Sequence, residues 1–180
     1  MVREAADPRH VSRPEAASTE PSYAERARAL VSLALSGTLS THSSHVPGFP
    51  FGSSTPYGLD ELGQPTFLFS GLAMHTHNLR ADPRASLFIP QADWTGDLLA
   101  GGRVSLLGRV LPVPSGDIDS VRAGYLTRHR QAEQWADFRD FGFYRMEITA
   151  IYYVAGFGAM GWVARAEYRA AAPGFTAAAI

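Results

Sequence analysis

The stretch Ser70-Gly-Leu-Ala-Met-His75-Thr76-His77-Asn78 carries the strongest signal in this chain, and the sequence around it decides the fold. An apolar, strand-like run precedes it, and its own composition predicts a short helix over residues 74–82 that Pro83 ends. The N–H groups and the dipole at the start of a helix favour anions. The hydroxyl, imidazole and amide groups here therefore predict hydrogen bonds to a phosphate group, and helix capping by Thr76 is the alternative interpretation.

The composition excludes several classes of chemistry. Among the 180 residues there is no cysteine, which excludes thiol catalysis, disulfide bonds and iron–sulfur clusters. All 16 basic residues are arginine, so a lysine Schiff base and a P-loop are impossible. The net charge of −1 argues against a broad nucleic-acid-binding surface. The length fits one domain.

The sequence predicts neither a secretory signal nor a membrane span. No apolar run reaches the roughly 18 residues that a spanning helix needs. Residues 1–21 are charged and contain proline, with no apolar signal region. We expect a disordered arm over residues 1–21, one domain over residues 22–170 and a flexible tail over residues 171–180. A cytoplasmic protein without a membrane partner is the resulting expectation.

Hydrophobic periodicity and breaker residues predict a mainly β (α+β) fold, with about six strands and three to five short helices. The clearest strand is residues 103–111, where Val104, Leu106 and Val110 alternate with Arg103 and Arg109. Helices do not alternate with strands as a parallel sheet requires, so an antiparallel barrel with peripheral short helices is favoured. Strands are expected at residues 37–41, 49–59, 65–70, 85–90, 103–111 and, as a pair, 141–155; helices are expected at 24–35, 74–82, 115–129, 131–138 and 162–169.

Two other patterns have plain interpretations. Gly156-Phe-Gly-Ala-Met-Gly161 matches the dinucleotide-binding pattern G-x-G-x-x-G, but a Rossmann unit needs a further strand with an acidic residue about 20 positions on. We interpret this segment as a glycine-rich turn that brings Trp162 to a surface. Four histidines suggest a metal site: His42, His45, His75 and His77. Their spacing is loose and no acidic residue lies beside either pair, so we expect no metal to bind there.

Six pieces of the sequence occur in a characteristic order. They lie within residues 27–41, 50–60, 70–87, 103–108, 137–141 and 156–162, and include Gly37-Thr-Leu-Ser-Thr41, Pro50-Phe-Gly-Ser53 and Arg103-Val-Ser-Leu-Leu-Gly108. In this order they resemble the FMN-binding split-barrel family related to pyridoxamine-phosphate oxidase. The closer likeness is to its single-domain, haem-utilisation-like branch.

The resemblance implies an antiparallel split β-barrel of Greek-key topology that forms a homodimer, with one FMN at each end of the subunit interface. Ser53 and neighbouring backbone groups would line the ring and ribityl chain, the segment after Ser70 would lie near the phosphate, and Trp162 would come from the partner. No catalytic residue is implied. The implied cofactor-binding residues are Gly52, Ser53, Ser54, Thr55, Pro56, Tyr57, Ser70, His75, Thr76, Asn78, Arg103 and Trp162.

An FMN-dependent oxidoreductase that acts on a small molecule is therefore the leading prediction. Two alternatives stay open, because one fold hosts several functions. Some relatives bind and degrade haem through a histidine in the C-terminal segment. This chain has no histidine after His129, so the haem interpretation needs an iron ligand from elsewhere. The other alternative is a dimeric module that has lost its cofactor.

Overall fold

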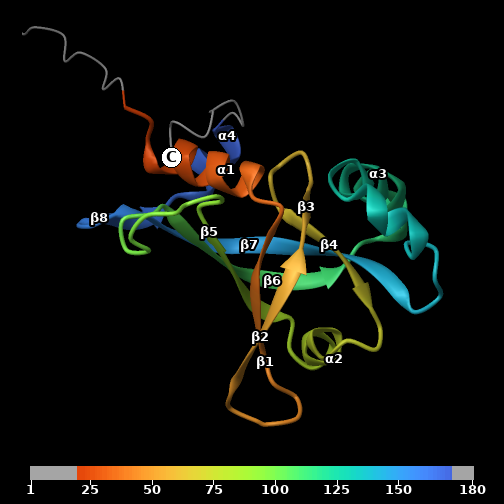
Figure 1. Ribbon diagram of the computed structural model, residues 1–180. Coiled ribbons are helices and arrows are strands. Elements are labelled where there is room, and N and C mark those ends of the chain that lie inside the picture. The colour runs from red at the N-terminus through yellow and green to blue at the C-terminus, as the bar shows by residue number, and fades with distance from the viewer. Residues whose placement is uncertain (1–19, 172–180) are drawn as a thin grey trace, which may run out of the picture.

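The computed structural model describes residues 20–171, which form one antiparallel sheet and a set of short helices (Figure 1). The strands are β1 (Ser36–His42), β2 (Pro50–Pro56), β3 (Gly58–Leu59), β4 (Pro65–Ser70), β5 (Arg84–Pro90), β6 (Arg103–Pro112), β7 (Phe141–Gly156) and β8 (Ala159–Val163). The helices are α1 (Tyr23–Leu33), α2 (Met74–Ala81), α3 (Ile118–Arg128) and α4 (Arg165–Ala170), with 3₁₀ turns η1 (Ser115–Asp117) and η2 (Arg130–Gln134).

The strands follow the order β2-β1-β5-β6-β7-β4-β3, and β8 pairs with β7. Every neighbouring pair is antiparallel, which confirms the expected sheet type. The 16-residue β7 is the longest strand. It pairs with β6 along most of its length, and also with β4 near its start and β8 near its end. Strand β7 thus links β4 and β3 to the rest of the sheet, which is curled (Figure 1).

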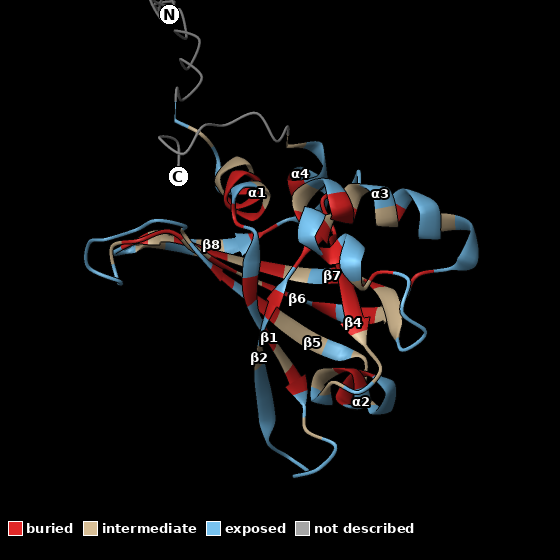
Figure 2. Ribbon diagram, turned by 45° about the vertical axis from the view of Figure 1, so that its right-hand side comes forward, coloured by how far each residue is buried: buried red, intermediate tan, exposed pale blue. Residues whose placement is uncertain are grey.

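The core lies on the inner face of the curled sheet. Along β6, Val104, Leu106 and Val110 are buried while Leu107 and Arg109 are exposed, so the alternation expected from the sequence is confirmed. Helix α1 covers this core with its buried face, and Figure 2 shows the buried stripe on the helix turned toward the sheet. Ser22 and Glu25 form a reciprocal capping box that starts α1.

Several expected elements differ from the structure. The strand expected at 49–59 is divided into β2 and β3, and the pair expected at 141–155 is the single strand β7. The helix expected at 131–138 is only the short turn η2. The helix expected at 162–169 starts later, because residues 159–163 form β8.

The glycine-rich segment after β7 explains the last of these differences. Gly156 has φ 127° and Gly158 has φ 75°, a region that residues with a side chain rarely adopt. These two glycines reverse the chain, so that β8 returns along β7 and carries Trp162 to the surface. The interpretation of this segment as a turn is confirmed.

Two absences concern only the described part of the chain. Within residues 20–171 no helix is long and apolar enough to cross a membrane. In the same residues, no three histidine or acidic side chains gather as a metal site would need. The arm and the tail expected at the two ends lie, apart from residues 20, 21 and 171, outside the described residues.

Candidate functional site

The outward face of the sheet, opposite the core, orders its side chains in cross-strand rows. In an antiparallel pair, residues directly opposite each other share a face, and the next row lies two residues along each strand. The first row, here called the cationic row, contains His42, Arg84 and Arg109, and it also includes Glu147 of β7, which lies opposite Arg109. Arg84 lies opposite Arg109, and His42 follows Thr41, which pairs with Ala85 of the same β5 strand.

Two further rows follow on the same face. The middle row consists of Gly52, Ser40, Ser86, Leu107 and Ala150. The aromatic row consists of Ser54, Thr38, Phe88, Ser105, Tyr152 and Trp162. The face thus changes from positive charge through small and apolar groups to aromatic rings within three rows.

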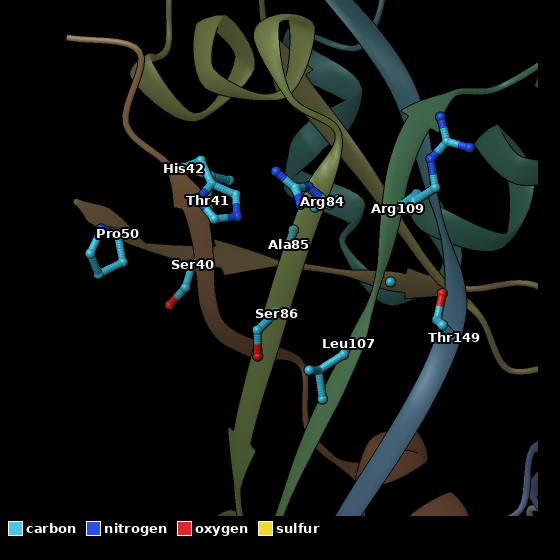
Figure 3. A pocket seen from close by; sticks show the side chains of 11 residues that line it. Ser40, Thr41, His42, Pro50, Arg84, Ala85, Ser86, Leu107, Arg109 and Thr149 are labelled. Atoms are coloured by element: carbon cyan, nitrogen blue, oxygen red, sulfur yellow. The ribbon is translucent and has the colours of Figure 1, made fainter. Parts of the chain in front are cut away.

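A groove of about 500 Å³ lies over the cationic and middle rows (Figure 3). Its surface is mostly apolar. A β-bulge opposite Leu107 and Gly108 leaves Thr149 outside the paired register, and this side chain lines one wall. Figure 3 shows the basic side chains at one end of the groove and Ser40, Ser86 and Leu107 beyond them. Pockets of this size commonly hold small organic ligands.

The two arginines of the groove differ in their partners. The Arg84 guanidinium donates to both carboxylate oxygens of Asp82, with Nε 2.9 Å from Oδ1 and 3.1 Å from Oδ2. These hydrogen bonds hold the pKa of Asp82 well below its usual range. The Arg109 guanidinium, by contrast, has neither a hydrogen bond nor an ion pair within residues 20–171, although Glu147 lies opposite Arg109 on β7. Arg109 is therefore the cation best able to meet an anionic ligand.

The segment that the sequence singles out, residues 70–78, lies beside the groove, and two of its polar side chains, Thr76 and Asn78, are buried. The Thr76 side chain is fully buried, and its Oγ1 donates to the Ser70 carbonyl oxygen at 2.7 Å. The Thr76 and His77 N–H groups both donate to the Ala73 carbonyl. At the start of α2, the N–H groups of Thr76 and His77 are therefore not free to bind an anion. Helix capping by Thr76 is also wrong, because Ala73 is the N-cap and no side chain caps it.

Other polar groups of this segment also have protein partners. Ser70 Oγ donates to Asp140 Oδ2 at 2.7 Å. The Asn78 side chain is fully buried and bonds to Thr41 of β1 and to Ser44 in the β1–β2 connection. His75 is half-buried, with its ring centroid 4.4 Å from that of Phe69. Burial lowers the pKa of His75, so its neutral form is favoured at neutral pH.

The residues expected on β2 divide between the two faces. Gly52, Ser54 and Pro56 share the outward face with β1 residues 40, 38 and 36, whereas Ser53 and Thr55 point inward. Tyr57 is fully buried, its hydroxyl donates to the Val31 carbonyl oxygen at 2.8 Å, and burial raises its pKa. The inward members of this segment thus belong to the core and its hydrogen bonds.

The last two expected residues, Arg103 and Trp162, both face outward. Arg103 Nη1 donates to the carbonyl oxygens of Leu99 at 3.2 Å and Gly101 at 3.1 Å, so it holds the loop between β5 and β6. Trp162 is 68% exposed, and its ring meets that of Tyr152 edge-on at a centroid distance of 5.0 Å.

The sequence-based prediction missed the residues of the groove itself. These are chiefly His42, Arg84, Ser86, Leu107, Arg109 and Thr149. The alternation along β6 contained part of the signal, because it already placed Arg109 on the polar side of that strand. Nothing local indicates that Arg84 and His42 stand beside it, since they belong to strands that pair over long sequence distances.

Comparisons with known proteins identify one family profile and two relatives named for haem. The sequence profile "CREG, beta-barrel" matches residues 18–170. The chain is 36% identical over 151 residues to the chloroplastic non-canonical haem oxygenase HOZ of Arabidopsis thaliana, an alignment that covers 82% of this chain and 46% of HOZ. It is 33% identical to a haem-binding protein from Mycobacterium smegmatis, whose structure matches with a TM-score of 0.78 and covers 84% of this chain and 62% of that one.

A more distant structure indicates the fold alone. A candidate pyridoxamine 5′-phosphate oxidase from Listeria innocua is 13% identical, with a TM-score of 0.57 over 75% of this chain and 100% of that one. Together these matches confirm the split barrel and the resemblance to the haem-utilisation branch of that superfamily. The chain spans about half the length of HOZ, as the 46% coverage shows.

Proposed function

The chain belongs to the CREG β-barrel family, and we propose that it is a haem-binding protein that holds haem in the outward groove. The observation that carries the proposal is the order of the three rows: first the two arginines and His42, then small side chains with Leu107, then the rings of Phe88, Tyr152 and Trp162. Haem has the same polarity, because its planar apolar ring carries two carboxylate groups along one edge. The two relatives above 30% identity that are named for haem support the same ligand.

The residues of the groove fit the chemical groups of haem. Arg109, with Arg84 beside it, would bind the carboxylates through charge-assisted hydrogen bonds. Leu107 and the mostly apolar surface around it would contact the ring. His42 supplies the imidazole of the groove, the side-chain type that most often binds haem iron. It is the ligand from elsewhere that the haem interpretation needs, given that no histidine follows His129.

Bound haem supplies a redox-active iron, and the protein's part is to bind and orient it. The cationic row would set which edge of the ring points toward α2. The hydroxyl groups of Ser40, Ser86 and Thr149 would supply hydrogen bonds along the groove.

We further propose that the protein acts as a homodimer whose partner covers the outward face. The aromatic row supports this, because Phe88 is 38% exposed and Trp162 is 68% exposed on one sheet face. Soluble monomers rarely expose contiguous large apolar groups, and such patches commonly mark interfaces. Trp162 would then contact the ligand or the sheet of the partner subunit.

An FMN-dependent oxidoreductase is the second candidate. The split barrel supports it, as does the outward position of Gly52, Ser54, Arg103 and Trp162 among the residues expected to bind FMN. Thr76 and Asn78 weigh against it, because both side chains are fully buried and bonded within the protein. Haem therefore ranks above FMN.

The test is a titration of the protein with ferric haem and, separately, with FMN, followed by absorbance. We expect saturable haem binding with a histidine-ligated spectrum. His42→Ala should weaken binding by roughly tenfold or more and lose that spectrum. The matched control is His77→Ala, which removes an exposed histidine of α2 that does not line the groove.

Two results would decide against the proposal. Wild-type protein that does not saturate with haem, or that takes up FMN instead, would overturn haem as the ligand. Haem binding that His42→Ala leaves unchanged would overturn the role of His42 while keeping the ligand.

A further inference from the structure

We infer that Asn78 is a positioning residue that holds the His42 imidazole in the groove. The inference rests on the proposed haem function, because its consequence is the geometry of the iron ligand. Asn78 belongs to α2, a helix beside the groove, and its side chain is fully buried. Asn78 does not line the groove, so it acts on any ligand only through the residues that it contacts.

The hydrogen bonds of Asn78 bracket His42. Its Nδ2 donates to Thr41 Oγ1 at 2.9 Å. Its Oδ1 accepts from both the backbone N–H of Ser44, at 2.8 Å, and Ser44 Oγ, at 2.9 Å. One amide group therefore ties the residue before His42 and the second residue after it to the same point on α2.

The position of His42 explains why such a tie matters. His42 is the last residue of β1; its strand pairs with β2 through His42 and Pro50, but the pairing with β5 ends one residue earlier, at Thr41 and Ala85. Beyond it the chain enters an exposed connection, where Val46 is 48% and Phe49 is 64% exposed. A side chain on a strand that is paired on one side only is less restricted, so the bonds of its chain neighbours affect its orientation.

The same helix also supports the neighbouring position of the cationic row. Asp82, the C-cap residue of α2, accepts a hydrogen bond from the Arg84 backbone N–H at 3.0 Å and from its guanidinium. Helix α2 thus bonds to the chain on both sides of His42 through Asn78, and to Arg84 through Asp82. The segment that the sequence predicted to bind the ligand supports the groove from its side instead.

The experiment compares Asn78→Leu, which keeps a similar volume without hydrogen bonds, with Leu79→Ala, which removes a buried neighbour on the same helix. Thermal unfolding measures the stability of each variant. The absorbance and electron paramagnetic resonance spectra of the haem-saturated protein report histidine ligation, and transfer of haem to an excess of an acceptor protein reports the dissociation rate. Nitrogen-15 relaxation of residues 41–45 without haem reports their mobility.

We expect both variants to lower the melting temperature, but only Asn78→Leu to change the ligand. Its haem-saturated spectrum should contain a fraction without histidine ligation, and haem should dissociate roughly tenfold faster, as for the loss of one or two hydrogen bonds. Residues 42–44 should become mobile. If Asn78→Leu does not fold, Ser44→Ala removes one of the three bonds at an exposed residue and should show the same changes at smaller size.

A folded Asn78→Leu variant with the wild-type spectrum and dissociation rate would overturn the inference. So would a Leu79→Ala variant that changes the spectrum equally, because lost stability would then be the cause. A failure of the proposed function is separate, since it would be seen in wild-type protein without saturable haem binding, or in an unchanged His42→Ala variant.

Discussion

The outward groove and the α2 segment both carry polar side chains, yet only in the groove is a charged group left without a bond inside the described part of the protein. In residues 70–78 the hydroxyl and amide groups are consumed by bonds within the protein, as Thr76 and Asn78 show. In the groove, Arg109 has no recorded partner within residues 20–171 and faces outward. A cluster of polar residue types is therefore informative about binding only once the side of the sheet it faces is known.

The largest expected effect tests the two faces at neighbouring residues of β6. Leu106 is fully buried in the core, whereas Leu107 is 37% exposed over the groove. Leu106→Ala should lower the free energy of unfolding by about 2–5 kcal/mol, because it leaves a cavity. Leu107→Ala should change it by less than about 0.5 kcal/mol. Urea unfolding of both variants measures the difference, and equal losses would contradict the assignment of faces.

The second prediction concerns the free cation of the groove. Arg109→Ala should weaken haem binding roughly tenfold, because a charge-assisted hydrogen bond to a carboxylate is lost. The haem dimethyl ester has no free carboxylate, so its affinity should be the same for wild type and variant. Arg122→Ala is the control, since Arg122 pairs with Asp137 at 2.9 Å and does not line the groove. An equal loss for haem and its ester would contradict carboxylate recognition by Arg109.

The smallest expected effect concerns Asp82 and pH. Arg84 depresses the pKa of Asp82 in the folded protein. The stabilisation is therefore fully present above the unfolded pKa, about 3.9, and is lost as the pH falls through the folded value. Asp82→Asn should lower the urea midpoint slightly at neutral pH. This difference should shrink below about pH 4. A difference that is unchanged in acid would show that the ionised carboxylate is not its source.

Much of the fold was predictable because its signals are local. Side chains alternate between the two faces of a strand, so the apolar and polar residues of β6 predicted its buried and exposed sides. Gly156 and Gly158 predicted a turn, because glycine readily adopts positive φ. The boundary errors arose where long-range pairing overrides local preference. Residues 162 and 163 were predicted as the start of a helix, but they belong to β8, which pairs along the edge of β7.

The candidate site was less predictable for the same reason. Of the residues expected to bind a cofactor, Gly52, Ser54, Pro56, Arg103 and Trp162 lie on the outward face. Thr55, Tyr57, Thr76 and Asn78 are buried instead. The sequence showed that polar residues follow β4. It did not show which partner each of them bonds to, because that depends on long-range contacts such as the one between Thr41 and Asn78.

The sequence by itself determined the antiparallel β class, the exclusion of thiol, lysine and P-loop chemistry, the polar side of β6 and the family resemblance. Only the tertiary structure decided which polar groups are available. His42, Arg84 and Arg109 are far apart in the chain, and strand pairing brings them into one row. The physical reason is that periodicity assigns a side chain to a face, whereas its neighbours across strands are set by long-range register.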